Sequence, residues 1–313
     1  MNEIIFFVLG LIGLWIGSEF ITRGSLGLSR KFGLSESFIG MVILSLGTDL
    51  PEIVVSVTGA IEKNHGIDTS GIVVGNVIGS NLGQMVLTLG LVGFVGGTIK
   101  ISKKEGWYQG ISLILSTLLF LVLATDGLIS KQDGWILLLG YLVYFLFISK
   151  SSKTMGKKTK KKKHNFGKLL ALLITGLIII FQSSTWVITT GVDLAIQFGI
   201  NQIVIGAILV GIGTSLPELV VSMNALSKGA KNLAISNLVG SNVVDILLAL
   251  GLGATISSWK VDRHVALFDL PFLLFTMVIV VLFMLSRRKL ERKESLLMIA
   301  LYVVYVSLKL IGW

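Results

Sequence analysis

The sequence predicts an all-α integral membrane protein with ten transmembrane helices in two inverted five-helix repeats. Three observations support this prediction: an apolar composition, ten apolar segments and a pair of repeated motifs. Hydrophobic residues make up 53% of the 313 residues and charged residues only 14%, unlike soluble domains. A bilayer core needs roughly 20 apolar residues per helix. The expected segments are 3–27, 34–61, 71–97, 107–125, 134–150, 168–197, 202–227, 232–257, 264–286 and 295–312.

The ten segments form two groups of five. Residues 1–150 make the first group, residues 151–167 form a Lys-rich loop, and residues 168–313 make the second group. The first segment has neither a basic leader nor a cleavage site, so we read it as a retained helix rather than a signal peptide. The chain has no cysteine, which excludes a disulfide framework and a thiolate metal site.

Two motifs occur once in each group. The motif "GTDLPEIVVS" at 47–56 agrees with "GTSLPELVVS" at 213–222 at eight of ten positions, at an offset of 166. The motif "GNVIGSNLGQMVLTLG" at 75–90 agrees with "SNLVGSNVVDILLALG" at 236–251 at seven of sixteen positions, at an offset of 161. Because each group holds an odd number of spans, the second copy enters the membrane upside down. Inverted repeats with Gly/Pro-interrupted helices are typical of secondary transporters.

The net charge of +10 is read as a signal of membrane topology, with no nucleic-acid partner. Loops on one side of the ten-segment layout hold 21 Lys and Arg residues, and loops on the other side hold four. The positive-inside bias therefore predicts a multi-pass protein of the plasma membrane with a cytoplasmic Lys-rich loop and two extracellular termini. Binding of that loop to anionic lipid or to a regulatory partner is left open as an alternative.

The repeated motifs place oxygen-bearing side chains on shared helix faces. Residues i and i+4 lie on one face, so Thr48, Glu52 and Ser56 form a polar stripe that the second motif repeats. Pro51 and Pro217 each remove a backbone donor, so nearby carbonyls are expected to be free to bind a ligand. These carbonyls belong to Ser45, Thr48, Gly211 and Thr214.

Carboxylates at mid-membrane need a counter-charge. The helices that carry Glu52 and Glu218 have no Lys or Arg at their centres, which argues against a purely structural buried pair. Carboxylates, hydroxyls and carbonyls together suit a hard cation. Ca²⁺ takes about six to eight oxygen ligands, whereas Zn²⁺ and copper favour nitrogen and sulfur.

At these residues the chain resembles the cation/calcium exchangers, whose two repeats carry G-T-S-x-P-E followed by G-S-x-x-x-[ND]. It looks closest to the prokaryotic Na⁺/Ca²⁺ exchangers, because the H⁺/Ca²⁺ branch typically has G-N-x-x-E instead. The resemblance covers essentially the whole chain. It implies a secondary antiporter that exchanges Na⁺ for Ca²⁺ by alternating access, with the first and sixth helices sliding against the rest. The implied partners are Ca²⁺, Na⁺ and the lipid bilayer, with no cofactor and no required oligomer.

The resemblance also implies which residues bind the ions. The two central Ca²⁺-binding glutamates fall on Glu52 and Glu218, aided by the carbonyls of Thr48 and Thr214. The flanking Na⁺ sites would use the carbonyls of Ser45 and Gly211, the third motif position at Asp49 and Ser215, and the hydroxyls of Ser80 and Ser241. Asp245 matches the family's fourth central position in the second repeat, and Gln84 stands at the equivalent place in the first. The chain departs from the family pattern at two of these positions, because Asp49 stands in place of Ser and Gln84 in place of Asn.

Several alternatives stay open at this stage. Asp49 either binds a cation or a proton, or caps a broken half-helix through backbone N–H groups. Asp245 and Gln84 either bind an ion or form an interhelical hydrogen bond. Glu19 and Asp269 are expected near helix ends, at the membrane interface. The alternative function is an H⁺/Ca²⁺ exchanger, since burial beside Glu52 would raise the proton affinity of Asp49.

Two other classes of function fit the sequence poorly. A cation channel would use rings from identical subunits, whereas here two unequal halves of one chain enclose a site. An enzyme is not expected, because the sequence has no HExxH, no nucleophile with its base and no paired-aspartate signature.

Overall fold

The computed structural model describes residues 2–151, 165–197, 215–286 and 288–311, and most of them are helical. The helical elements, with η marking π-helix, are α1 (Asn2–Phe32), α2 (Glu36–Phe38), η1 (Ile39–Leu44), α3 (Ser45–Thr48), α4 (Leu50–Asn64), α5 (Ser70–Leu82), η2 (Gly83–Thr88), α6 (Leu89–Gly96), α7 (Lys103–Leu123), α8 (Lys131–Ser151), α9 (Phe166–Gln197), α12 (Leu216–Ser227), α13 (Lys231–Val244), η4 (Asp245–Ala249), α14 (Leu250–Ile256), η5 (Val265–Asp269), α15 (Leu270–Ser286) and α16 (Arg292–Leu310).

The expected membrane spans are largely confirmed as helices. Seven stretches of the described residues are long and apolar enough to cross a membrane, and the bent pair formed by residues 36–48 and α4 makes an eighth. The helices that contain these stretches begin and end within five residues of the expected bounds. α12 and α16 fall in the two remaining expected segments, 202–227 and 295–312, but residues 202–214 and residue 312 of those segments lie outside the described residues. The count of ten therefore stays a prediction.

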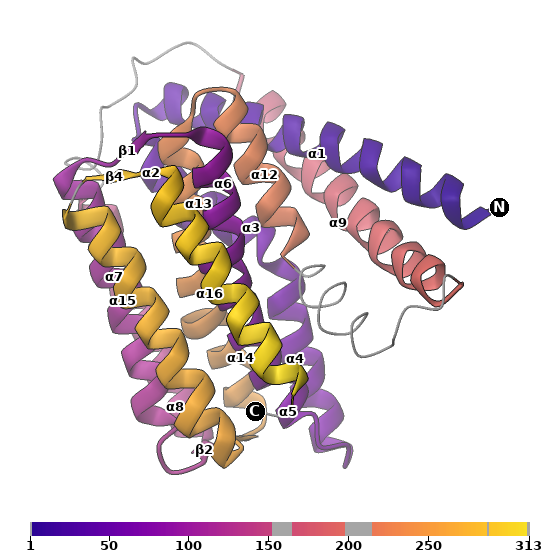
Figure 1. The fold of residues 1–313 in the computed structure, drawn as a ribbon, viewed down its shortest axis with the longest axis vertical. Helices are drawn as coiled ribbons and strands as arrows, with labels where there is room; N and C mark the ends of the chain where they lie inside the picture. Colours follow the sequence, from indigo (N-terminus) through magenta and orange to yellow (C-terminus); the bar gives the residue numbers. More distant parts are fainter. Residues whose placement is uncertain (1, 152–164, 198–214, 287, 312–313) are drawn as a thin grey trace.

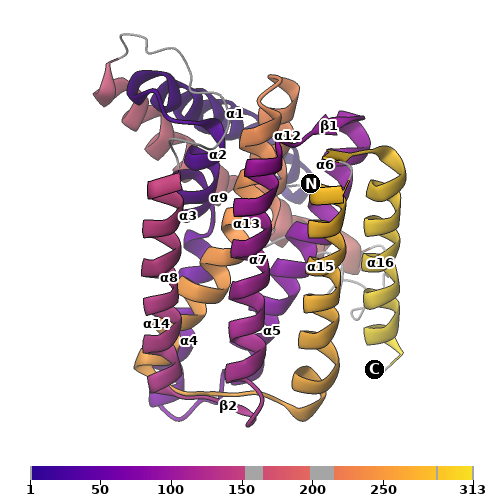
Figure 2. The ribbon, with the colours of Figure 1, turned by 90° about the vertical axis from the view of Figure 1, so that its left-hand side faces the viewer.

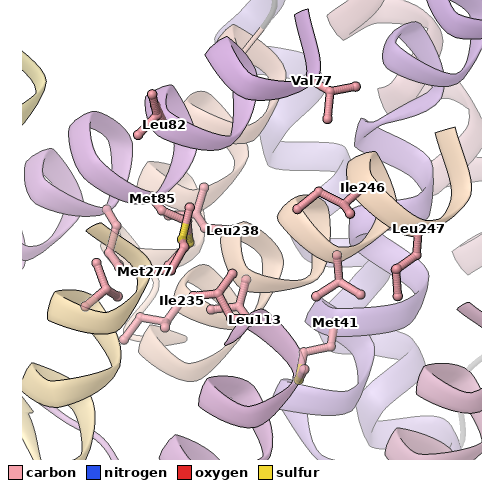
Figure 3. Close-up of a cluster of buried hydrophobic side chains, with 14 of the residues drawn as sticks. Met41, Val77, Leu82, Met85, Leu113, Ile235, Leu238, Ile246, Leu247 and Met277 are labelled. Atoms are coloured by element: carbon pink, nitrogen blue, oxygen red, sulfur yellow. The ribbon is translucent and has the colours of Figure 1, made fainter. Parts of the chain in front are cut away.

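Two of the long helices form the centre of the molecule: α5–η2–α6 and α13–η4–α14. In the most apolar 18 residues of the central helix 231–256, 94% of the residues are buried, whereas in the most apolar 18 residues of the outer helix α8 28% are buried. Figure 3 shows side chains of both central helices, among them Met85, Leu238 and Ile246, packed in one apolar cluster. The outer helices instead expose large apolar residues such as Trp15 and Leu139, as a lipid-facing surface requires.

Both central helices contain a π-helical segment at the same place in the repeated motif. Gln84 is the second residue of η2, and Asp245 is the first residue of η4. The two residues are equivalent at the offset of 161. π-Helical turns are rare and are frequently found at functional sites. Sequence patterns did not predict these segments, because one extra residue in a turn leaves the apolar periodicity almost unchanged.

Four two-residue strands link residues 1–150 to residues 168–313: β1 (Ile99–Lys100), β2 (Leu128–Ile129), β3 (Trp259–Lys260) and β4 (Lys289–Leu290). β1 pairs antiparallel with β4, with Ile99 opposite Leu290. β2 pairs antiparallel with β3, with Ile129 opposite Trp259. The two pairs lie at opposite ends of the helix bundle (Figures 1 and 2). Each pair thus joins a strand from one half of the chain to a strand from the other half.

α1 and α9 run side by side and extend beyond the rest of the bundle (Figure 1). Their close approach requires glycine at two positions. A Cβ atom on Gly17 would lie 2.9 Å from the Gly176 carbonyl oxygen, and a Cβ atom on Gly176 would lie 2.9 Å from the Gly17 carbonyl oxygen. Small residues allow such backbone contact between membrane helices.

A carboxylate ties α1 to α12. Glu19 lies in the middle of α1 rather than near a helix end, so the expected placement was wrong. Lys228 Nζ donates to Glu19 Oε1 at 2.6 Å, Asn224 Nδ2 donates to Glu19 Oε2 at 3.3 Å, and Arg23 also pairs with it. Asp269 lies at the start of its span, as expected, and accepts hydrogen bonds from Lys309 and Tyr305 of α16.

Candidate cation site

The first motif breaks its helix at Asp49. This residue has φ −86° and ψ 9°, and the helical stretches on either side meet at an angle of 46°. Ser215 in the second motif has nearly the same conformation, with φ −92° and ψ 7°. In both motifs a helix starts at the next residue and has proline in its first turn, where the missing N–H is tolerated. From Asp49 and from Ser215 onward, the two motifs therefore share one backbone geometry.

The break brings three carboxylates together. Asp49, Glu52 and Glu218 each offer an oxygen, and these oxygens all lie within 4.8 Å of one another. All three side chains are buried, with at most 2% exposure. Glu52 stands in the first turn of α4 and Glu218 in the first turn of α12, so the two helix N-termini point their partial positive charge at the cluster.

Nothing in the described part of the chain neutralises this cluster. The six carboxylate oxygens of Asp49, Glu52 and Glu218 have no hydrogen-bond partner there. No ion pair of the described residues includes any of the three. Asp49 makes no capping hydrogen bond, which argues against the helix-cap alternative. Buried like charges at this spacing repel each other and lose their hydration, so the cluster requires a cation or protons.

A fourth carboxylate, Asp245, is held differently. It is fully buried at the start of η4, and its Oδ2 accepts hydrogen bonds from Ser80 Oγ at 2.8 Å and from Gln84 Nε2 at 3.4 Å. Its Oδ1 has no partner among the described residues. The structure therefore brings Ser80, Gln84 and Asp245 together, as the repeat alignment predicts. It also shows the interhelical hydrogen bond that was the alternative for Gln84.

The remaining predicted residues are hydroxyls without a partner in the described part of the chain, groups that are already hydrogen-bonded, or residues outside that part. Ser215 and Ser241 are buried, and their hydroxyl oxygens have no partner in the described part. The Ser45 carbonyl accepts the Asp49 amide at 2.9 Å and the Thr48 hydroxyl at 3.3 Å, so the expectation that this carbonyl is free was wrong. The Thr48 hydroxyl also reaches the Leu44 carbonyl at 3.2 Å, within its own helix. Gly211 and Thr214 lie outside the described residues.

Two asparagines beside the site were not predicted as site residues. Asn81 and Asn242 are fully buried and contact Asp245 and Gln84 respectively. A signal for them exists in the sequence, because the tripeptide Gly-Ser-Asn is identical in both copies of the second motif. The prediction omitted them because it named only the motif positions that bind ions in the family.

The donor set of the site suits a hard cation. Buried carboxylate, hydroxyl and amide oxygens converge there, and the motifs contain no cysteine or histidine. Ca²⁺ is bound in proteins by about six to eight such oxygens in flexible geometry. A group of three unpaired carboxylates can also accept monovalent cations or protons, because each binding event reduces the repulsion between them. The site can therefore hold different cations in turn.

Comparison with known proteins decides the family. The family model for "Sodium/calcium exchanger protein" matches residues 2–150 and 168–311. The chain belongs to this family. It is 25% identical to the sodium/calcium exchanger MaX1 of Methanosarcina acetivorans, over 96% of both chains. It is 30% identical to the uncharacterized membrane protein MJ0091 of Methanocaldococcus jannaschii, again over 96% of both chains.

The fold agrees with a solved structure of the same family. The sodium-calcium exchanger NCX_Mj superimposes on the chain with a TM-score of 0.84 and 29% sequence identity, and the match covers 98% of each chain. The match extends over both halves of the molecule. The fold on which the site is built is therefore that of a multi-pass exchanger.

We expect Asp49→Asn to separate charge repulsion from cation binding. Removing one of three like charges should raise the melting temperature without divalent cations, because the empty cluster repels itself less. The same change should reduce the stabilisation by Ca²⁺, since a tenfold weaker Kd removes about 1.4 kcal/mol. Thermal unfolding of the purified protein with and without CaCl₂ measures both effects.

The matched control is Glu62→Gln, which neutralises an exposed carboxylate on the same helix as Glu52. It should leave both melting temperatures unchanged. An equal Ca²⁺-induced rise in the wild-type protein and in Asp49→Asn would contradict a role for Asp49 in binding.

Proposed function

We propose that the chain is a secondary active antiporter that exchanges Na⁺ for Ca²⁺ across the plasma membrane by alternating access. The observation that carries the proposal is the group of three buried carboxylates, unpaired among the described residues, at the start of two equivalent helices. Membership of the sodium/calcium exchanger family and the names of MaX1 and NCX_Mj support the choice of ions. The ions are substrates rather than cofactors, and the family is one of exchangers rather than enzymes.

Competition for one set of ligands explains the coupling. Glu52 and Glu218 together balance one Ca²⁺ or two Na⁺, and Asp49 adds a third negative charge. When the cluster is empty, its repulsion and lost hydration make it costly to carry through the occluded state. When it is loaded, its charge is offset. The two ions therefore cross in alternation, and Ser215, Ser241, Ser80, Asp245 and the carbonyls of Thr48 and Thr214 complete their ligands.

The architecture proposed for this mechanism is two inverted repeats, residues 1–150 and 168–313, joined by the loop at 151–167. It is supported by the equal backbone conformations of Asp49 and Ser215 and by the equivalent π-helical segments η2 and η4. The reciprocal strand pairs β1–β4 and β2–β3 at opposite ends of the bundle also support it. One chain contributes both halves of the site, so no oligomer is required.

The moving part is proposed to be the helix pair α1 and α9. These two helices pack mainly against each other and extend beyond the rest of the bundle (Figure 1). The ion pair of Glu19 with Lys228 links α1 to α12, so sliding of α1 must lengthen or replace this contact. Such a contact favours the state in which it is made.

A transport assay tests the function. Purified protein in liposomes should take up ⁴⁵Ca²⁺ when Na⁺ is higher inside than outside, and not in response to a K⁺ gradient. Glu52→Gln and Glu218→Gln should each abolish uptake, while Glu62→Gln should transport normally. Uptake driven by a proton gradient with no need for Na⁺ would contradict Na⁺ coupling and favour the H⁺/Ca²⁺ alternative. Wild-type uptake rates in either site variant would show that the substituted glutamate is not needed for transport.

The orientation in the membrane is a separate prediction. The Lys-rich loop should be cytoplasmic, and the loop that holds His65 should be extracellular, because 21 Lys and Arg residues lie on the first side and four on the second. In this cysteine-free chain, His65→Cys should react with an impermeant thiol reagent added to intact cells. Lys160→Cys, in a loop outside the described residues, should react only after the cells are opened. The reverse pattern would overturn the orientation.

A further inference from the structure

Two buried asparagines form a reciprocal contact between the halves of the chain. Asn81 and Asn242 are equivalent at the offset of 161, as are Gln84 and Asp245. Asn81 contacts Asp245 of the other half, and Asn242 contacts Gln84 of the other half. Each asparagine therefore contacts, in the opposite half, the residue at the last position of the G-S-x-x-x-[ND] pattern.

Each asparagine uses its two amide hydrogens in the same way. Asn81 Nδ2 donates to the Val77 carbonyl of its own helix at 2.7 Å and to Asp245 Oδ2 at 3.4 Å. Asn242 Nδ2 donates to the Leu238 carbonyl of its own helix at 2.9 Å and to Gln84 Oε1 at 2.8 Å. An amide group has two donors, so one hydrogen fixes the side chain to its helix and the other reaches across.

This arrangement decides which way Gln84 faces. Its Oε1 accepts the hydrogen bond from Asn242, so its Nε2 is the group that faces Asp245, at 3.4 Å. Asp245 Oδ2 then receives Ser80, Asn81 and Gln84 as donors, whereas Oδ1 is buried and has no partner among the described residues. The two oxygens of one carboxylate thus have different surroundings.

We propose that Asn81 and Asn242 are positioning residues: Asn242 makes Gln84 a hydrogen-bond donor to Asp245, and the two asparagines together leave Asp245 Oδ1 for the transported cation. The proposal deepens the proposed function. Gln84 then acts through Asp245 and is not itself a cation ligand. Groups that orient a metal ligand typically change affinity on the order of 10- to 100-fold when they are removed.

Equilibrium binding of ⁴⁵Ca²⁺ to the purified protein in detergent tests the proposal, with Na⁺ displacement as a second readout. Asn242→Ala should weaken Ca²⁺ binding on the order of tenfold in the wild-type background. It should have no further effect in a Gln84→Ala background, because Asn242 acts only through Gln84. Asn81→Ala should weaken binding in both backgrounds, because Asn81 contacts Asp245 directly.

The matched control is Asn237→Ala. Asn237 is a buried asparagine on the same helix as Asn242, and it donates to Ser222 rather than to Gln84 or Asp245. Its removal should leave Ca²⁺ affinity unchanged. Should Asn242→Ala fail to fold, Asn242→Ser takes its place, because the serine side chain is too short to reach Gln84.

Two results would overturn the proposal. One is an equal loss of affinity on removing Asn242 in the presence and absence of Gln84. The other is a lower melting temperature with unchanged Ca²⁺ and Na⁺ binding, which would make the asparagines merely structural. Because the readout is binding, a wild-type protein that binds Ca²⁺ without exchanging it would contradict the proposed antiport and leave this test intact.

Discussion

Three buried carboxylates that have no cationic partner among the described residues are the constraint on which the rest of the structure depends. In water each would be hydrated, and in a soluble protein a buried acid is normally paired with a base. Here Asp49, Glu52 and Glu218 have neither arrangement in the described part of the chain. No described residue offsets their repulsion, so we propose that cations or protons from outside the protein do. Stability and transport are therefore linked, because the ions that fill the site also stabilise the helices around it.

The helix architecture follows from the need to bring these groups together and still satisfy the backbone. Helices that start directly after Asp49 and Ser215 direct two N-termini at the site, which favours negative charge there. The π-helical segments η2 and η4 start at or next to Gln84 and Asp245 in the two most buried helices. The outer helices cover this centre and face the lipid. Four acidic groups are thereby buried, and among the described residues a network of amides and a hydroxyl supports Asp245 alone.

Many of the helices could be predicted from the sequence, because the apolar length of a span follows directly from the thickness of the bilayer. The repeated motifs and the resemblance they carry predicted Glu52, Glu218, Ser80 and Asp245 as site residues, and the structure buries all four. The hydrogen bonds of the Ser45 carbonyl could not be predicted, because they depend on how one turn closes before Asp49. The direction of the Gln84 amide was equally hidden, since it is set by Asn242, 158 residues away in the sequence. The place of Glu19 was predicted wrongly because two of its partners, Asn224 and Lys228, are more than 200 residues away in the sequence.

A structure determined in the presence of Ca²⁺ tests the central claim most directly. Crystals grown with CaCl₂ should show an anomalous difference peak between Asp49, Glu52 and Glu218, with carboxylate oxygens at about 2.3–2.6 Å from it. The peak should disappear when the same crystals are transferred to high Na⁺, because the two ions share ligands. An empty cluster whose carboxylates are paired with protein groups, with the anomalous peak elsewhere in the molecule, would contradict the account.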